Sequence, residues 1–253
     1  MWVARAGVVM PTAELAMLTS AILTIAFLYS SVGHAGASGY LAVLALAGLA
    51  PAEMKPVALT LNVIVATVGT AQFMRAGHFD WRLFWPFALT SAPFAFAGGA
   101  LSLSTRGFHA LVGLVLLLSA ARFLMRPTVD GQARTPSVGV SMAVGGALGL
   151  LAGLTGTGGG VFLTPVLLFC GWADTRRASA TSVLFILVNS LAGLAGNWSA
   201  THAPPTFVWP LAVAALLGGS VGSTLGSRVL PPRVIQRMLA AVLLIAGLKL
   251  LAA

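Results

Sequence analysis

The sequence predicts an all-α integral membrane protein made of two inverted repeats of about five helical segments each. Of its 253 residues, 58% are hydrophobic and only 8% are charged, whereas a soluble domain carries about 25% charged residues. Apolar runs of about 20 residues, long enough to span a bilayer, recur along the chain. A glycine cluster in the second half of the chain also matches one in the first half. We therefore expect a chain that crosses the membrane several times.

Ten apolar segments fall into two sets of five. The first set covers residues 12–31, 38–50, 57–74, 83–103 and 107–125, and the second covers 138–155, 160–171, 178–197, 208–228 and 234–252. A polar linker separates the two sets. The predicted units are a first transmembrane repeat over 12–125, an inter-repeat linker over 126–137 and a second transmembrane repeat over 138–253.

The two glycine clusters lie at equivalent places in the two sets. Gly33, Gly36 and Gly39 recur 120 residues later as Gly153, Gly156 and Gly159. Such clusters interrupt a membrane helix, and a break at membrane depth is tolerated only inside protein or beside a polar cavity. Paired breaks in two halves of a transporter point to its binding site. We therefore expect glycine-tipped broken or re-entrant helices that meet near the midplane.

The second segment of each half is too short to cross a bilayer as a straight helix. Twelve residues, as in 39–50, rise only ~18 Å against a hydrocarbon core of ~30 Å. Each short segment is predicted to be one arm of a hairpin, or alternatively a strongly tilted or shielded full span. Either arrangement gives an odd number of crossings per half and hence inverted repeats. A single broken helix followed by three spans would give parallel repeats.

The basic residues predict the orientation of the chain. In the inverted arrangement ten of them lie on one side and four on the other, and the side richer in arginine is expected to be cytoplasmic. The ten are Arg75, Arg82, Arg122, Arg126, Arg134, Arg176, Arg177, Arg228, Arg233 and Arg237, and the four are Arg5, Lys55, Arg106 and Lys249. Both termini are then predicted to face outward from a bacterial inner membrane.

The glycine tips supply the candidate substrate-binding residues. A helix that starts after each tip points unpaired N–H groups and its positive dipole end at the site, which favours an anion. His34 can donate to an anion, carry a coupled proton, or only bond a carbonyl. The glycines can alternatively serve close helix packing. The candidates at the tips are Gly33, His34, Gly36, Ser38, Gly39, Thr155, Gly156, Thr157, Gly158, Gly159 and Gly160.

One polar residue on the third segment of each half completes the predicted site. Asn62 matches Ser182 at the same offset of 120 residues. Either residue can donate to an anion without carrying charge, or form a hydrogen bond between helices. The other polar residues of these segments are predicted to make interhelical bonds, and they are Thr60, Thr67, Ser179, Thr181, Asn189 and Ser190. Lys55 is predicted to cap the helix that follows it or to anchor that helix at the membrane interface.

Other classes of function find little support. The chain has no HExxH, GxSxG or Walker motif and no paired carboxylates, so we expect no catalytic residue, no metal site and no cofactor. The net charge of +9 is scattered over segment ends, which argues against nucleic acid. A single cysteine, Cys170, excludes an internal disulfide. The expected partners are a small anionic substrate and the lipid bilayer, with a homo-oligomer possible.

These motifs resemble the TauE/SafE family, the sulfite-exporter family. The resemblance rests on residues 152–160, Pro165, Gly171 and residues 178–182, and residues 33–40 look like a variant that carries His34 and lacks the glycine triplet. The family resemblance implies bacterial inner-membrane transport of sulfite, sulfonates or related anions.

Together the residues and the resemblance predict a secondary transporter, an exporter of a small sulfur-containing oxyanion such as sulfite or an organosulfonate. The alternatives are a passive anion channel and a non-transporting membrane assembly partner. Saturable flux with trans-stimulation separates a carrier from a channel. For an assembly partner, replacing Gly158 or Gly159 would change complex formation and leave anion movement unaffected.

Overall fold

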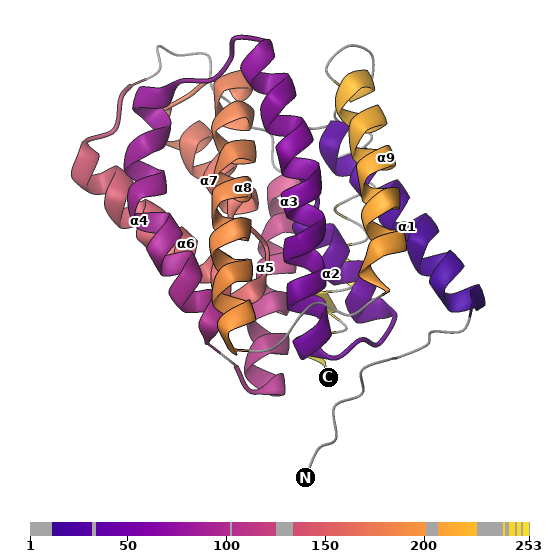
Figure 1. Cartoon of the computed structure of the whole chain (residues 1–253). Coiled ribbons are helices and arrows are strands. Elements are labelled where there is room, and N and C mark those ends of the chain that lie inside the picture. The colour runs from indigo at the N-terminus through magenta and orange to yellow at the C-terminus, as the bar shows by residue number, and fades with distance from the viewer. Residues whose placement is uncertain are drawn as a thin grey trace.

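The computed structural model describes residues 12–31, 34–101, 103–124, 134–200 and 207–226, and 240, 243–245, 247–248 and 250–252 near the C-terminus. All regular structure in these residues is helical, as the sequence predicts (Figure 1). The helices with assigned bounds are α1 (Thr12–Ser31), α2 (Ala37–Leu46), α3 (Pro51–Arg75), α4 (Trp81–Ala100), α5 (Thr105–Leu124), α6 (Val138–Thr155), α7 (Gly160–Phe169), α8 (Thr175–Ala200) and α9 (Val208–Gly226).

Five of these helices are long and apolar enough to cross a membrane. They are α1, α3, α6, α8 and α9. The short second segment of each half is also present, because α2 and α7 have 10 residues each, a rise of about 15 Å. The third helix of each half is longer than predicted. Charged residues such as Lys55 and Arg176 lie inside its first turn, where hydropathy alone does not detect a helix.

Polar contacts define the two ends of the helix bundle. At one end, which we call the arginine end, the Arg177 guanidinium at the start of α8 lies 3.8 Å from the Asp80 carboxylate at the start of α4. At the other end, the Lys55 end, the Lys55 ammonium in the first turn of α3 donates to the Gly98 carbonyl near the end of α4 at 3.0 Å. Consequently α3 and α8 pass each other in opposite directions through the centre of the bundle (Figure 1).

The hairpin of α6 and α7 begins and ends near the same end of the bundle. The Arg134 N–H, just before α6, donates to the Gly171 carbonyl, just after α7, at 2.8 Å. The Trp172 ring also lies 6.2 Å from the Phe87 ring, in the first half of α4. The chain therefore leaves the arginine end along α6, turns at Gly156–Gly159, and returns along α7.

Two helix pairs hold the predicted halves together through glycine. Along α6, a Cβ atom at Gly145, Gly149 or Gly153 would collide with the backbone of α4. Along α9, a Cβ atom at Gly218 or Gly222 would collide with the backbone of α1. The fourth helix of each half thus packs closely on the first helix of the other half.

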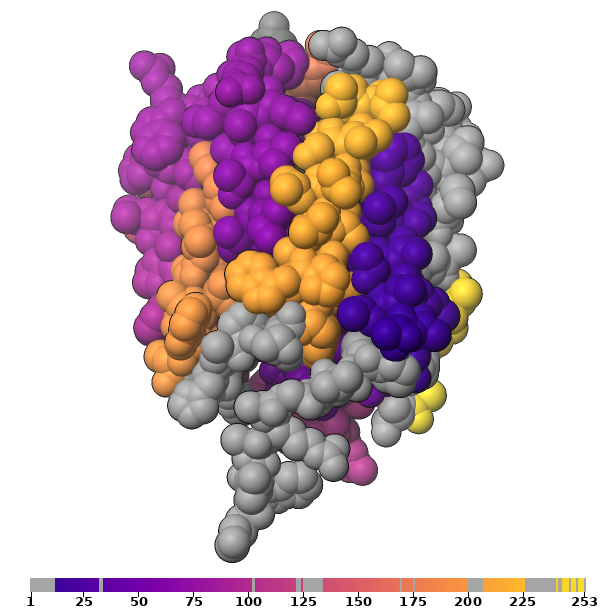
Figure 2. Space-filling model, turned by 45° about the vertical axis from the view of Figure 1, so that its right-hand side comes forward, coloured from indigo at the N-terminus to yellow at the C-terminus, as the bar shows by residue number. Residues whose placement is uncertain are grey.

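The buried apolar side chains form two clusters that share α8. One cluster joins α1, α2, α3, α5 and α9 with Val183 and Ile186 of α8. The other joins α4 and α7 with Ala178 and Phe185 of α8. Figure 2 shows α9 lying between α1 and α3 on one face of the molecule. Large apolar side chains such as Trp209, which is 65% exposed, cover the outside of α9, and a surface of this kind suits contact with lipid tails.

Candidate functional site

The second glycine tip is an irregular turn between α6 and α7. Gly156, Gly158 and Gly159 have φ angles of 79°, 70° and 78°, a left-handed conformation that glycine adopts without steric cost. Helix α6 ends at Thr155, and α7 starts at Gly160. The glycine cluster therefore breaks the helix as the sequence predicts.

The start of α7 presents unpaired backbone donors. Within the described chain, no hydrogen-bond acceptor pairs with the backbone N–H groups of Gly158, Gly159, Gly160 and Val161. These groups lie at the positive end of the α7 dipole, where a negative charge is stabilised. Consecutive N–H groups in a glycine turn also form a concave surface that fits an anion. This end of α7 has the chemistry of an anion site.

Two helices at the centre of the bundle meet this tip. A Cβ atom at Gly158 would lie 2.8 Å from the Ser190 hydroxyl and 3.0 Å from the Asn62 amide nitrogen. The Asn62 amide donates to the Ser190 hydroxyl at 3.3 Å. Asn62 lies near the middle of α3 and Ser190 near the middle of α8. The structure therefore brings Asn62 to the tip and adds Ser190, which sequence analysis assigned to an interhelical bond.

Thr155 and Thr157 shape the tip from within. Their hydroxyl oxygens lie 2.9 Å apart, and the Thr155 hydroxyl also donates to the Leu151 carbonyl at 2.7 Å. The Thr157 N–H donates to the Thr155 hydroxyl at 3.3 Å. In this arrangement both hydroxyl protons are used inside the tip. A direct contact of either threonine with an anion stays a prediction.

The first tip reaches the second half through His34. The His34 Nε2 atom lies 3.1 Å from the Thr164 hydroxyl of α7, and this hydroxyl lies 2.7 Å from the Ser182 hydroxyl of α8. His34 and Ser182, both predicted from sequence, thus share Thr164 as a partner. Sequence analysis missed Thr164, whose only signal is its position one turn after Gly160. Gly33 lies outside the described residues.

The remaining residues of the first tip pack against tyrosines. The Ser38 hydroxyl lies 2.8 Å from the Tyr29 hydroxyl, and a Cβ atom at Gly39 would lie 2.6 Å from the Tyr29 ring. Gly36 has a φ angle of 108° and precedes α2, and the Tyr40 hydroxyl donates to the nearby Ala35 carbonyl at 2.8 Å. Tyrosine side chains therefore fill this tip. Contact of Gly36, Ser38 or Gly39 with a substrate stays a prediction.

Several buried polar atoms on α3 and α8 lack a partner among the described residues. They include the Asn62 Oδ1 atom, the Thr181 hydroxyl and both polar atoms of the Asn189 amide. Asn62, Thr181 and Asn189 are all 0% exposed. Unpaired buried polar groups are rare, and each calls for an explanation such as a bound molecule. The interhelical bonds predicted for Thr181 and Asn189 are not formed within the described chain.

Lys55 is buried within the protein at the Lys55 end of the bundle. Lys55 is only 6% exposed. The ammonium group donates to the carbonyls of Gly98, Gly99 and Leu101 at 3.0, 2.8 and 3.2 Å, so it caps the C-terminal end of α4. The prediction that Lys55 caps the helix that follows it is wrong, because within the described chain its ammonium group bonds only to carbonyls at the end of α4.

Comparison with known proteins gives the family of the chain. The family described as sulfite exporter TauE/SafE matches residues 18–250. The chain is 42% identical over 241 residues to the probable membrane transporter protein y4hK of Sinorhizobium fredii, covering 92% of this chain and 97% of that protein. It is 26% identical over 261 residues to the probable membrane transporter protein YjnA of Bacillus subtilis, covering 93% and 100% of the two chains.

A further match covers a shorter part of the chain. The chain is 31% identical over 143 residues to the probable membrane transporter protein MamO of Paramagnetospirillum magneticum, covering 53% of this chain and 22% of that protein. No solved structure gives a match. With broken helices, apolar spans and a family match over nearly its whole length, the chain belongs to the TauE/SafE family of bacterial multi-pass membrane transporters.

Proposed function

We propose that this protein exports a small oxyanion of sulfur, sulfite or an organosulfonate, across the bacterial inner membrane. The observation that carries the proposal is the run of N–H donors at Gly158–Val161, which have no acceptor within the described chain, with Gly158 beside Asn62 in the middle of α3. The oxygens of a sulfite or sulfonate group accept several hydrogen bonds at once. The match to a family described as sulfite exporters supports the same substrate class.

The uncharged donors of the site suit transport better than permanent binding. Among the described residues, the hydrogen bonds of Asn62, Ser190, Thr164 and Ser182 involve no lysine, arginine or carboxylate side chain. The Asn62 amide donates to Ser190 and leaves its oxygen unpaired. If the amide turns over, its oxygen accepts from the Ser190 hydroxyl and its nitrogen donates to an anion. Neutral donors hold an oxyanion without the cost of separating an ion pair on release.

The helix directions support inverted repeats as part of this proposal. Helices α3 and α8 are the third helices of the two halves, and they run in opposite directions between the Lys55 end and the arginine end. In each close pair, α4–α6 and α9–α1, the fourth helix of one half packs on the first helix of the other half. Two repeats related by symmetry would make such a matching set of contacts. The Gly158 tip lies at the middle of both central helices, so we place the site near the midplane. Alternating exposure then follows from rocking of one repeat against the other.

The distribution of arginines supports an orientation of the protein, and the membrane potential supports an outward direction of transport. Arg75 at the end of α3 and Arg82 at the start of α4 lie with Arg176 and Arg177 at the arginine end, which the positive-inside rule assigns to the cytoplasm. Both termini then lie outside. An inside-negative potential drives an anion outward with ~2.3 kcal/mol per charge per 100 mV, so export needs no coupling ion. A proton carried by His34 is the alternative means of coupling.

Flux in proteoliposomes tests the proposed function. We expect saturable sulfite movement that is accelerated by sulfite on the opposite side and driven by an imposed potential. Linear, fast, electrogenic flux without trans-stimulation would identify a channel instead. Folded, reconstituted protein that moves neither sulfite nor methanesulfonate would contradict the proposal and favour an assembly partner.

Replacing Thr164 tests the link between the first tip and α8. We expect Thr164→Val to lower sulfite transport about tenfold and to lower the unfolding free energy by about 1–2 kcal/mol, since buried hydroxyl partners on His34 and Ser182 are lost. Thr164→Ser keeps the hydroxyl and serves as the matched control. The measurements are initial rates in proteoliposomes and thermal unfolding in detergent. Equal transport by the Val and Ser variants would exclude this link from the transport mechanism.

A further inference from the structure

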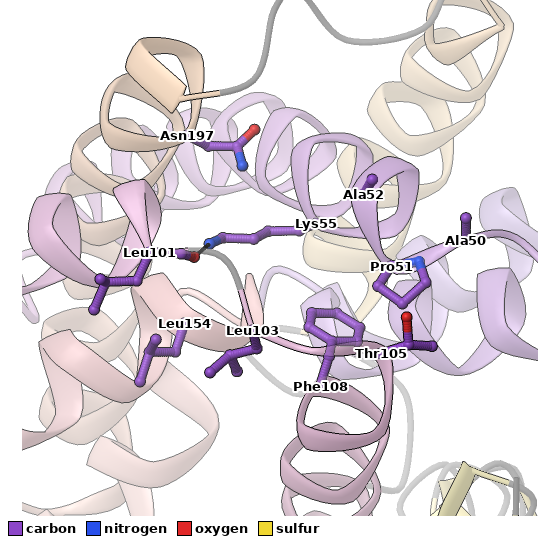
Figure 3. A pocket seen from close by; sticks show the side chains of 10 residues that line it. All are labelled: Ala50, Pro51, Ala52, Lys55, Leu101, Leu103, Thr105, Phe108, Leu154 and Asn197. Atoms are coloured by element: carbon purple, nitrogen blue, oxygen red, sulfur yellow. Dashed lines mark hydrogen bonds between the residues drawn. The ribbon is translucent and has the colours of Figure 1, made fainter. Parts of the chain in front are cut away.

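A cavity of about 240 Å³ lies beside Lys55 at the Lys55 end of the bundle (Figure 3). Its lining comes from the start of α3, the chain that follows α4, and the last turns of α6 and α8, and includes Ala52, Lys55, Leu101, Thr105, Leu154 and Asn197. In Figure 3 the Lys55 side chain stretches across the cavity towards Leu101, and the Asn197 amide lies on the same side as the ammonium group. Apart from these groups and Thr105, the named lining is apolar.

The charge of Lys55 is not neutralised by a carboxylate. The ion pairs in the described chain join Arg177 to Asp80 and to Asp174, all at the arginine end. The three hydrogen bonds of the Lys55 ammonium go to neutral backbone carbonyls. They fix the position of the ammonium group but leave a net positive charge beside an apolar cavity. Such a charge attracts anions strongly, because the low-dielectric walls focus its field.

The cavity adjoins the second tip through Lys55 itself. A Cβ atom at Gly156 would lie 3.3 Å from the Cα and Cγ atoms of Lys55. Leu154, which lines the cavity, is followed directly by Thr155 of the tip. The cavity therefore lies next to the second tip, on the side that faces the Lys55 end.

We infer that the cavity beside Lys55 is an anion-binding vestibule, which receives a small sulfur oxyanion between the glycine tip and the outer face of the membrane. This inference rests on the proposed function for the identity of the anion and for the side that faces outward. In the vestibule, Lys55 supplies the attraction, and Thr105 and Asn197 lie within the same lining.

The rate at which charged reagents modify a cysteine in the cavity tests the vestibule without requiring transport. Ala52 lines the cavity and is exposed, so Ala52→Cys is placed in a Cys170→Ser protein that has no other cysteine. The measured quantity is the ratio of modification rates by an anionic and a cationic methanethiosulfonate reagent. We expect Lys55→Met to lower this ratio about tenfold and Lys55→Arg to keep it.

A cysteine at the other end of α3 provides the control. Ala76 follows α3 at the arginine end and is exposed, so the ratio at Ala76→Cys should not respond to Lys55→Met. We also expect sodium methanesulfonate to slow modification of Ala52→Cys while Lys55 is present, beyond the effect of sodium chloride at equal ionic strength. If Lys55→Met does not fold, this protection by methanesulfonate is by itself the test of anion binding in the cavity.

Two outcomes would overturn the vestibule. One is an unchanged reagent ratio at Ala52→Cys in folded Lys55→Met protein, and the other is no protection by methanesulfonate. Failure of the proposed function looks different, because the parent protein would then move no sulfite in proteoliposomes although the cysteine rates still report an anion-attracting cavity. If the parent protein transports sulfite but Lys55→Met leaves the reagent ratio unchanged, the proposed function stands and the vestibule is excluded.

Discussion

Replacing Asn62 with leucine is expected to lower sulfite transport roughly 10- to 100-fold while leaving the fold intact. A hydrogen bond to a charged group contributes about 1.5–3 kcal/mol, and the proposed site loses one such donor. Stability should be unchanged or higher, because the variant removes a buried amide oxygen that has no partner and a long 3.3 Å bond to Ser190. The measurements are initial flux in proteoliposomes and thermal unfolding in detergent.

A matched control comes from the same helix. Thr60 lies two residues before Asn62, and its hydroxyl donates to the Pro56 carbonyl of its own helix at 2.8 Å. We expect Thr60→Val to transport sulfite at the parental rate. If folded Asn62→Leu protein instead transports sulfite at the parental rate, Asn62 does not bind the anion.

Replacing Gly153 with valine is expected to destabilise the protein by about 3 kcal/mol or more. A Cβ atom at this position would collide with the Ala95 carbonyl and lie 2.8 Å from the Gly99 nitrogen of α4. Both neighbours are backbone atoms of a helix, which cannot move aside as a flexible side chain can, so the helices must separate. Because α6 leads into the second tip, transport should be lost as well.

A glycine at the far end of α6 supplies the comparison. A Cβ atom at Gly139 would meet no atom within 4 Å, so Gly139→Ala should be neutral or should stabilise the helix by about 0.5–1 kcal/mol. Unfolding temperatures of the two variants, measured side by side in detergent, test this contrast. Equal stability of the two variants would mean that α4 and α6 do not pack as closely as described.

Local features of the chain account for the parts of the fold that were predictable. A run of apolar residues directly indicates a span, and a glycine cluster inside such a run directly indicates a break. The short helices α2 and α7 and the tips before them were predicted in this way. The turn at the second tip could be predicted without knowing which helices surround it, because a left-handed turn favours glycine wherever it occurs.

Contacts between distant segments account for what sequence reasoning missed. Lys55 was predicted to cap the helix that follows it, but the carbonyls that accept from its ammonium group belong to α4 and lie more than forty residues away in the sequence. Thr164 is a candidate only because it contacts His34 and Ser182, which come from two other segments of the chain. The glycine stripe of α6 is visible in the sequence, but its partner α4 is not. These features depend on the tertiary arrangement of the helices.

The two tips also differ in a way that their matching glycines do not reveal. Tyr29 and Tyr40 fill the first tip and bond to Ser38 and to the Ala35 carbonyl. In the second half, Gly149 and Gly160 occupy the positions equivalent to these tyrosines, and the N–H groups at the start of α7 have no acceptor among the residues that the structure describes. The second tip is therefore the main anion site in our proposal, and His34 is the contribution of the first.

Location of a bound anion tests the central claim most directly. Selenite has the shape and charge of sulfite, and its selenium atom gives an anomalous signal in crystal diffraction. We predict a selenium peak whose oxygens lie within about 3.2 Å of the backbone nitrogens of Gly158–Val161 and beside Asn62. A well-ordered tip with no selenium, in a crystal that holds selenite elsewhere in the protein, would contradict the account.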